Sequence, residues 1–281
     1  MHCSFAPRVL RPFPRKQLQN GLIFFCLAFL FWQCGRPPQK STRLSGTQVV
    51  QAAARLSPAE REKYLSSRLA KDSLPTFLRT FRPVTLTATA PNGQLLQGMC
   101  FVMPDYLAVG SDKDFVRMPL QPKTAQKVAE ALGCTLPTRK IVDAIYAAAK
   151  IKLEPIPLTK DRDSVRTFLQ HNQLIENQRK RYKLGLLTAG HKKDVVLTPR
   201  LRRQPRANRV AIYGWHQLDG SPIQPLYLGH IDTYTDYSQG IRLVLDRFEV
   251  AGSVYTLQQL LAHPLFKHLV CDEEICEPVR Y

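Results

Sequence analysis

The chain has 281 residues, of which 44% are hydrophobic and 22% are charged, and its formal net charge is +18. This length and composition are those of a globular protein with a hydrophobic core, in one large domain or two small ones. The lysines and arginines are spread along the chain without a recognisable nucleic-acid motif, so we expect no nucleic-acid partner and attribute the charge to attraction toward anionic lipid or anionic wall polymer.

The first 33 residues have the pattern of an export signal, a basic segment followed by a short apolar run at residues 22–32. This run is shorter than the 20 or so apolar residues that a spanning helix needs. Cys34 follows, and the polar stretch 34–46 then reads as a tether. The order resembles a bacterial lipoprotein signal, which implies a lipid anchor at Cys34, although Phe31, Trp32 and Gln33 stand where smaller residues are usual. An uncleaved membrane anchor is the alternative, and both place the protein in the cell envelope.

Residues 47–82 are predicted to form an N-terminal helical extension. Val49, Val50, Ala53 and Leu56 recur at helical spacing, and the run 57–60 of Ser, Pro, Ala and Glu is the start signal of a second helix. In such a capping box, the serine and the glutamate bind backbone N–H groups that the first turn of a helix leaves free. We therefore expect two helices before the main domain.

From residue 83 the pattern changes to the alternation of a β-hairpin, with Asn92 and Gly93 between its two strands. Asn-Gly is a strong hairpin signal because both residues tolerate positive φ. A short strand is expected near residues 105–112. Helices are predicted at residues 122–132, 138–150 and 163–182, where apolar residues recur at i, i+3 and i+4.

Strands are predicted over residues 194–198, 209–215, 223–228, 240–246 and 248–255. A helix over residues 256–270, restarted at Pro264, closes the chain. Strands on both sides of a helical block predict an α+β fold, with a mixed or antiparallel sheet and a single domain over residues 83–281. Cys271 and Cys276 have a spacing that closes a small disulfide loop in an oxidising compartment, and two free thiols are the alternative.

The stretch 190–243 concentrates the residues that carry chemistry, because histidines, aromatics and glycines interleave there with β-branched runs. Glycine permits sharp turns, and strand ends and loops aim polar side chains into one cavity. The predicted catalytic residues are His191, His216, His230, Ser238 and Arg242. The predicted ligand-binding residues are Lys192, Lys193, Asp194, Tyr213, Trp215 and Tyr237.

Residues 237–242 resemble the Ser-His-Gly-Cys-Ile/Val-Arg motif of L,D-transpeptidases, which cross-link peptidoglycan through a cysteine thiolate. Ile241 stands where that family has its cysteine, and Gln239 and Tyr213 stand where it has histidines. The nucleophile of that family is therefore absent. A broader likeness, carried by residues 105–108, 136–143, 190–194, 213–216 and 237–242, resembles a family of exported bacterial proteins of unknown function. It implies secretion and one domain, and no mechanism.

Two hypotheses remain for the function. The first is a hydrolase or transferase on wall-type polymer, and its metal-dependent form would use zinc, for which His191, His216, His230 and Asp232 are ligand types. It predicts that the catalytic residues converge on one pocket. The second is a non-catalytic envelope protein that binds glycan or peptide, with tyrosines and Trp215 as flat faces and Lys192, Lys193 and Arg242 as partners of carboxylates or phosphates.

Overall fold

The computed structural model describes residues 44–71, 74–203 and 206–281. The predicted export signal, most of the predicted tether and Cys34 lie outside these residues. Within the described ranges, no helix is both long and apolar enough to cross a bilayer. The described chain begins almost directly with a helix, since Ser45 caps a first turn that starts at Gly46.

Two helices open the domain, α1 (Gly46–Ala53) and α2 (Pro58–Lys71), as predicted. Both begin with a capping box, and in the second the Ser57 N–H donates to the Glu60 carboxylate at 3.0 Å. The buried residues of α1, among them Val49 and Val50, belong to the same hydrophobic cluster as the strands that follow. A single 3-10 turn, η1 (Thr76–Arg79), then leads into the first strand. The two helices are therefore packed parts of one core.

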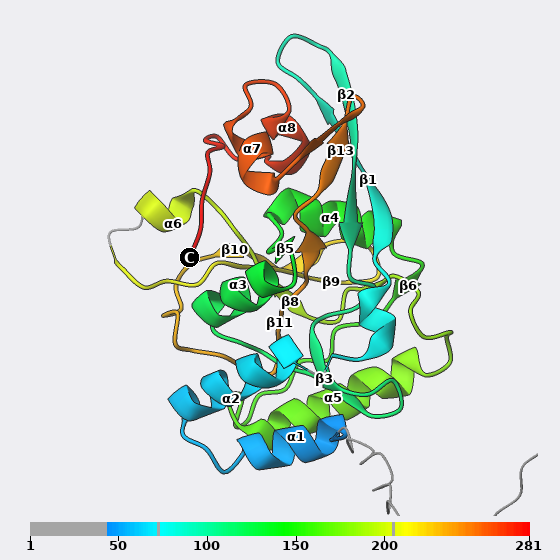
Figure 1. Cartoon of the computed structure of the whole chain (residues 1–281), viewed down its shortest axis with the longest axis vertical. Coiled ribbons are helices and arrows are strands. Elements are labelled where there is room, and N and C mark those ends of the chain that lie inside the picture. Colours follow the sequence, from blue (N-terminus) through cyan, green and yellow to red (C-terminus); the bar gives the residue numbers. More distant parts are fainter. Residues whose placement is uncertain (1–43, 72–73, 204–205) are drawn as a thin grey trace, which may run out of the picture. The chain divides into compact units, whose positions relative to one another are not determined.

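The larger sheet is built on a hairpin of β1 (Arg82–Thr89) and β2 (Leu95–Val102), whose turn places Gly93 at a φ of 82°. Its strand order is β14-β13-β2-β12-β5, and β1 pairs with β2 beside this path. The short strands are β5 (Cys134–Thr135), β12 (Val244–Leu245), β13 (Phe248–Val250) and β14 (Ser253–Tyr255). In Figure 1 the hairpin projects beyond the rest of the sheet.

The smaller sheet has the order β10-β9-β8-β11, and its β8 and β11 pair in parallel. Its strands are β8 (Lys193–Val195), β9 (Ile212–His216), β10 (Pro222–Tyr227) and β11 (Gln239–Gly240). Two further strand pairs lie outside both sheets, β3 (Ala108–Gly110) with β4 (Phe115–Arg117) and β6 (Ile151–Lys152) with β7 (Thr188–Ala189). All strands of the smaller sheet come from the stretch that the sequence singled out.

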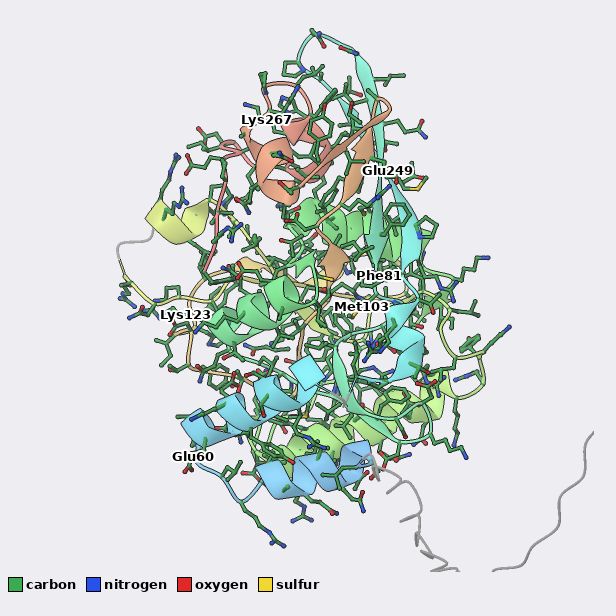
Figure 2. All side chains as sticks on the ribbon, in the orientation of Figure 1. Glu60, Phe81, Met103, Lys123, Glu249 and Lys267 are labelled. Carbon is green, nitrogen blue, oxygen red and sulfur yellow. A yellow bond between two sulfur atoms is a disulfide. The ribbon has the colours of Figure 1, made fainter. Side chains whose placement is uncertain are left out.

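The helices pack against these sheets from several sides. They are α3 (Pro122–Ala131), α4 (Arg139–Ala148), α5 (Val165–Arg179), α6 (Arg200–Arg203), α7 (Leu257–Ala262) and α8 (Lys267–Val270). Figure 1 shows α1, α2 and α5 together at the end of the domain away from the hairpin, with α7 and α8 beside the hairpin. In Figure 2, Met103, only 1% exposed, lies in the interior, whereas the exposed Glu60 and Lys123 lie at the edge.

The fold is α+β, as predicted, and the predicted helices are present. Two strand predictions need correction. Residues 248–255 form two strands rather than one, because Ala251 and Gly252 take positive φ and turn the chain back. Residues 240–246 are likewise divided, since Gly240 ends β11 in the smaller sheet and Val244 begins β12 in the larger one.

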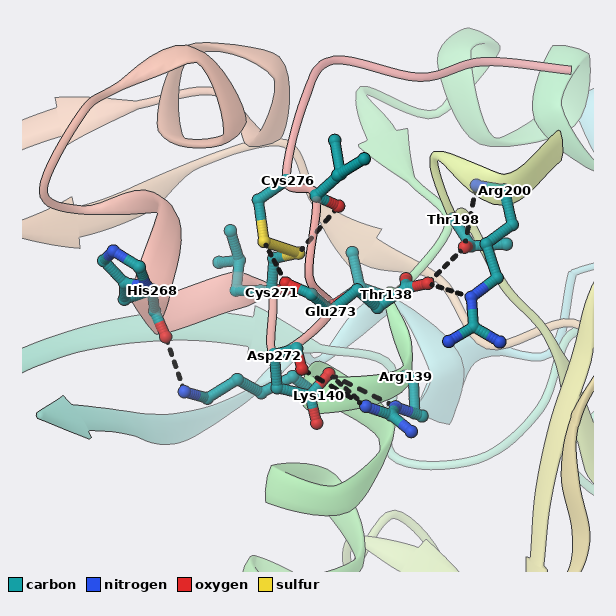
Figure 3. The surroundings of a disulfide bond; sticks show 12 residues. Thr138, Arg139, Lys140, Thr198, Arg200, His268, Cys271, Asp272, Glu273 and Cys276 are labelled. Carbon is teal, nitrogen blue, oxygen red and sulfur yellow. Dashed lines mark hydrogen bonds and ion pairs between the residues drawn. A yellow bond between two sulfur atoms is a disulfide. The ribbon is translucent and has the colours of Figure 1, made fainter. Parts of the chain in front are cut away.

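The C-terminal segment is closed by a disulfide between Cys271 and Cys276, one of the two alternatives that their spacing left open. Figure 3 shows that the carboxylates inside this loop reach two other elements. Asp272 pairs with Arg139 of α4 at 2.9 Å, and Glu273 pairs with Arg200 of α6 at 3.1 Å. Glu273 also accepts a hydrogen bond from the Thr198 hydroxyl at 2.7 Å. The disulfide loop thereby connects the end of the chain to α4 and α6.

Candidate functional site

The smaller sheet brings together three separate runs of the sequence. Asp194 of β8 pairs with Tyr213 of β9 on one side and with Gly240 of β11 on the other. Within β9, Gly214 and Trp215 both take positive φ, at 100° and 57°, which is a strained conformation for tryptophan. Beyond this irregular backbone, Trp215 contacts Lys193 and His216 contacts Tyr146.

A buried ionic network begins at Asp105, whose carboxylate accepts two hydrogen bonds from the Arg117 guanidinium, at 2.9 and 2.5 Å. The same carboxylate lies 3.1 Å from Nε2 of His191, and Arg117 also pairs with Glu176 at 2.9 Å. Burial raises the pKa of Asp105, but Arg117 and His191 outweigh it and hold that pKa well below its ordinary value. Asp105 is therefore an anion held between two donors.

His191 is neutral in this network. Burial lowers its pKa to about 4, against the opposing influence of Asp105. Among the described residues its Nδ1 has no hydrogen-bond partner, which fits a ring that donates its one proton from Nε2 to the Asp105 carboxylate. The imidazole is only 1% exposed, so a ligand in solution has no access to it.

A second part of the network joins Tyr106, Asp194 and Arg242. The Tyr106 hydroxyl donates to Asp194 at 2.8 Å, and the Arg242 guanidinium lies 4.1 Å from the centre of the Tyr106 ring. Arg242 donates to the carbonyl oxygens of Met103 and Thr188, at 3.0 and 2.7 Å. Burial raises the pKa of Asp194 to about 6, with Arg242 opposing the shift. Arg242 thus connects its own segment to the backbone at Met103 and Thr188 and to the Tyr106 ring.

Ser238 belongs to a third part, centred on Asp236. The Ser238 hydroxyl and N–H both donate to Asp236, at 2.5 and 2.8 Å, and Arg162 pairs with the other oxygen of that carboxylate at 2.9 Å. Lys193 lies 3.6 Å from it. Because the serine proton is committed to a carboxylate and no histidine lies beside it in these contacts, Ser238 has the environment of a structural hydroxyl.

Lys192 is the most deeply buried cation of the predicted ligand-binding set, at 1% exposed. Its ammonium group donates to the Tyr237 carbonyl oxygen at 2.5 Å. Burial, and next the charge of Arg117, lower its pKa to about 7. Tyr237 is equally enclosed, and its hydroxyl donates to the Leu158 carbonyl oxygen at 2.8 Å. Trp215 is 5% exposed, with the Lys193 ammonium 5.5 Å above its ring.

His216, the last residue of β9, contacts Tyr146 and Asp143. Its ring stacks on Tyr146 with 4.5 Å between ring centres, and its Nε2 is 3.1 Å from Asp143. The Tyr213 hydroxyl donates to the same carboxylate at 2.8 Å. His216 is 3% exposed, and Asp143, with 43% of its side chain exposed, is the part of this group that solvent reaches.

His230 lies apart from the other histidines, at the surface between two tyrosines. Its ring centre is 5.2 Å from that of Tyr227 and 4.8 Å from that of Tyr234. The Tyr227 ring, 45% exposed, lines a groove of about 420 Å³. The groove is lined by Arg200, Arg206, Arg209, Leu226, Tyr227, Leu228 and Gly229. We call this the basic groove.

The five predicted catalytic residues therefore divide into three places. His191, Ser238 and Arg242 lie inside the buried network, His216 lies against Tyr146, and His230 lies beside the basic groove. The four predicted zinc ligands are similarly dispersed, and Asp232 pairs with Lys123 at 2.9 Å. Within the described residues, no group of three or more His, Cys, Asp and Glu side chains is arranged to hold a metal ion.

Several residues of these arrangements were not predicted from the sequence. Asp105 and Arg117 anchor the network, and Arg200, Arg206 and Arg209 line the basic groove. Arg117 carried a usable signal, because a charge directly after Phe115 and Val116 in a short apolar strand has to be paired when it is buried. The arginines of the groove also carried a signal, because residues 200–209 contain Arg202 and Arg203 as well and form a strongly basic run.

Comparisons with protein-family models, with curated proteins and with solved structures give no match for this chain. The resemblances to L,D-transpeptidases and to an exported bacterial family thus stay predictions that the printed sequence carries alone.

Proposed function

We propose that this chain is an exported, lipid-anchored protein of the cell envelope whose folded domain binds anionic wall polymer without catalysis. The observation that carries the proposal is the basic groove, in which three arginines and an exposed tyrosine line one surface hollow. No acidic side chain lines the groove among the described residues. Guanidinium groups bind carboxylates and phosphates through paired N–H donors, so this lining suits a polyanion.

The burial of the other candidate residues favours binding over hydrolysis or group transfer. His191, Ser238 and Arg242 are at most 1% exposed, and each is hydrogen-bonded to protein atoms. A polymer would reach them only after the domain opened, and such an opening would break buried ion pairs such as Asp105–Arg117. The basic groove needs no such opening, because Arg200, Arg206 and Tyr227 are exposed and Arg209 is half-exposed.

Two further observations support an extracytoplasmic site of action. The leader ends at Cys34 with the order of a lipoprotein signal, and the Cys271–Cys276 disulfide is of the kind that persists in oxidising compartments. The net charge of +18 adds a long-range attraction toward polyanions that the groove then binds locally.

The proposal is tested by titrating the full-length chain with polygalacturonate at several salt concentrations and following binding by calorimetry. We expect the affinity to fall steeply as salt rises, because screening weakens contacts between exposed charges. Arg206→Ser should weaken binding by about 3- to 10-fold, the size of an interface charge contact. Arg206 is exposed, so the variant is expected to fold normally.

The matched control is Arg55→Ser, which removes an exposed arginine in the turn between α1 and α2, outside the groove lining. It should change the affinity by less than about twofold, since only the long-range charge is altered. Equal losses in the two variants, or binding that does not respond to salt, would overturn the groove as the binding site. Release of shortened polymer during the titration would favour the hydrolase hypothesis instead.

A further inference from the structure

The basic groove has an aromatic wall with a specific construction. The Tyr227 side chain folds back over Gly229, so that a Cβ placed on Gly229 would lie 1.9 Å from the Tyr227 hydroxyl oxygen. Any side chain at position 229 would displace the ring. Gly229 is not at a positive φ, and therefore its backbone does not itself require glycine. The missing side chain makes room for the tyrosine ring alone.

An arginine reaches the same glycine from the neighbouring segment. The Arg209 guanidinium donates to the Gly229 carbonyl oxygen at 2.8 Å, and Arg209 also forms an isolated antiparallel bridge with Ile231. The hydroxyl end of the Tyr227 ring and one edge of the Arg209 guanidinium thus meet at Gly229. Among the described residues, the bond to Gly229 is the guanidinium's one hydrogen bond, so its remaining N–H groups are available beside a half-exposed aromatic ring.

The aromatic surface continues away from the arginines. Next to Tyr227 stands His230, and next to His230 stands Tyr234, whose ring is inclined by 31° to the imidazole. The Tyr234 hydroxyl lies 3.5 Å from the Asp236 carboxylate, at the same oxygen that Arg162 and Lys193 contact. Through these ring contacts the Tyr227 ring is connected to the buried network. An aromatic ring held by such contacts loses little entropy when a ligand packs on it.

We infer that Tyr227 and Arg209 form a subsite for one acidic sugar residue, so that the polymer bound in the groove is an anionic glycan. The sugar ring packs on the exposed face of Tyr227, and its carboxylate binds the free N–H groups of Arg209. Aromatic side chains with one polar end suit such amphipathic rings, whereas a polymer of phosphate alone offers nothing to the ring. The inference rests on the proposed function and specifies the class of polymer.

The test compares two polyanions on the full-length chain, polygalacturonate and inorganic polyphosphate of matched charge, by calorimetry at one salt concentration. Tyr227→Ala should weaken polygalacturonate binding by about tenfold, as for a central aromatic contact, and change polyphosphate binding by less than about twofold. Gly229→Ala should act in the same direction by displacing the ring while leaving both Tyr227 and Arg209 in the chain. Tyr182→Ala, at a tyrosine 42% exposed just past the end of α5, is the control and should change neither.

The outcomes separate the two claims. Polyphosphate binding as tight as polygalacturonate binding, or equal losses for both polymers in Tyr227→Ala, would overturn the sugar subsite while leaving polyanion binding in place. Unchanged polygalacturonate affinity in Tyr227→Ala and Gly229→Ala would also overturn it. A wild-type chain that binds neither polymer would contradict the proposed function itself. Double-stranded DNA bound as tightly as polygalacturonate would overturn the glycan assignment.

Discussion

At the scale of single residues, Asp105 joins Arg117 and His191 inside the buried network. It is 2% exposed, and it neutralises Arg117, which is 1% exposed. Buried ion pairs add little net stability compared with apolar packing, but removal of one partner leaves an uncompensated charge in a medium of low polarity. Arg117 retains Glu176 at 2.9 Å, which softens the loss without replacing the two hydrogen bonds to Asp105.

We therefore predict that Asp105→Asn lowers the free energy of unfolding by about 3 kcal/mol, as for other broken buried pairs. Urea unfolding followed by tryptophan fluorescence measures this as a shift of the midpoint at constant slope. Asp163→Asn, at an exposed position just before α5, should stay within about 0.5 kcal/mol of the wild type. A midpoint in Asp105→Asn equal to that of the control would contradict the role of Asp105 as the anchor of the network.

Residue by residue, the sequence indicated where polar chemistry gathers but not that it is buried. The runs 190–194, 213–216 and 237–242 do adjoin in the smaller sheet. Their polar partners include Asp105 and Arg117, which lie about a hundred residues earlier in the chain, and Arg117 is in turn held by Asn172 and Glu176 of α5. The sequence of residues 190–243 alone does not reveal that Asp105 and Arg117 lie against it, because only the tertiary fold brings them there.

At the scale of single elements, β9 is held in an unusual shape by Gly214. Its φ of 100° is one that side chains rarely adopt, and an added Cβ would lie 3.3 Å from the His216 ring and 3.4 Å from Val142. Gly252, in the turn between β13 and β14, has a φ of 78° with open space around it. Gly252 therefore reports the cost of a positive φ alone, whereas Gly214 combines a larger φ with close contacts to His216 and Val142.

We predict that Gly252→Ala destabilises the protein by about 1 kcal/mol, the cost of a positive φ, and that Gly214→Ala destabilises it by about 3 kcal/mol because crowding against His216 adds to that cost. Thermal unfolding followed by circular dichroism gives both values in parallel. The order of the two variants is the decisive result, and equal losses would mean that β9 accommodates the extra methyl group by moving His216.

The C-terminal segment depends on a covalent link that spans only a few residues. Closing so short a loop stabilises the folded state by about 2 kcal/mol in the chain-entropy model. The double variant Cys271→Ser with Cys276→Ser should unfold earlier by that amount, and dithiothreitol should bring the wild type to the same midpoint. The other described cysteines, Cys100 and Cys134, are buried free thiols, so the variant itself should not respond to the reductant. Equal midpoints for wild type and variant without reductant would contradict this role.

The elements themselves were largely predictable, because local signals decide them. Capping at Ser57 and the Asn-Gly turn before β2 act within a few residues. Strand boundaries were less predictable where the chain passes from one sheet to the other. Between Gly240 and Val244 the apolar pattern continues without a break, since both sides of the passage are buried, and only the three-dimensional arrangement divides it.

At the scale of the whole molecule, the stability of the fold depends on pH, because several buried groups have shifted pKa values. Burial, and next the charge of Lys192, lower the pKa of His171 to about 2, while burial lowers that of His191 to about 4. Both are neutral in the folded state and protonated in the unfolded state below a pH of about 6.5. Asp194, with its pKa raised to about 6, acts in the opposite direction, because the folded state then holds a proton that the unfolded carboxyl has already lost.

At pH 5 the unfolded state thus binds about two extra protons at His171 and His191 and about one fewer at Asp194, so these three groups together make stability rise with pH by about 1.4 kcal/mol per unit. Urea midpoints at pH 4.5, 5.0 and 5.5 measure the slope. His171→Phe keeps an aromatic ring against Tyr237 and removes one of the two protons, which should lower the slope by about 1.4 kcal/mol per unit. Asp194→Asn removes the opposing group and should raise the slope by about 1 kcal/mol per unit. The two substitutions change the difference in bound protons between the folded and unfolded states with opposite sign. If the slope moved in the same direction in both variants, groups other than His171 and Asp194 would determine the dependence of stability on pH.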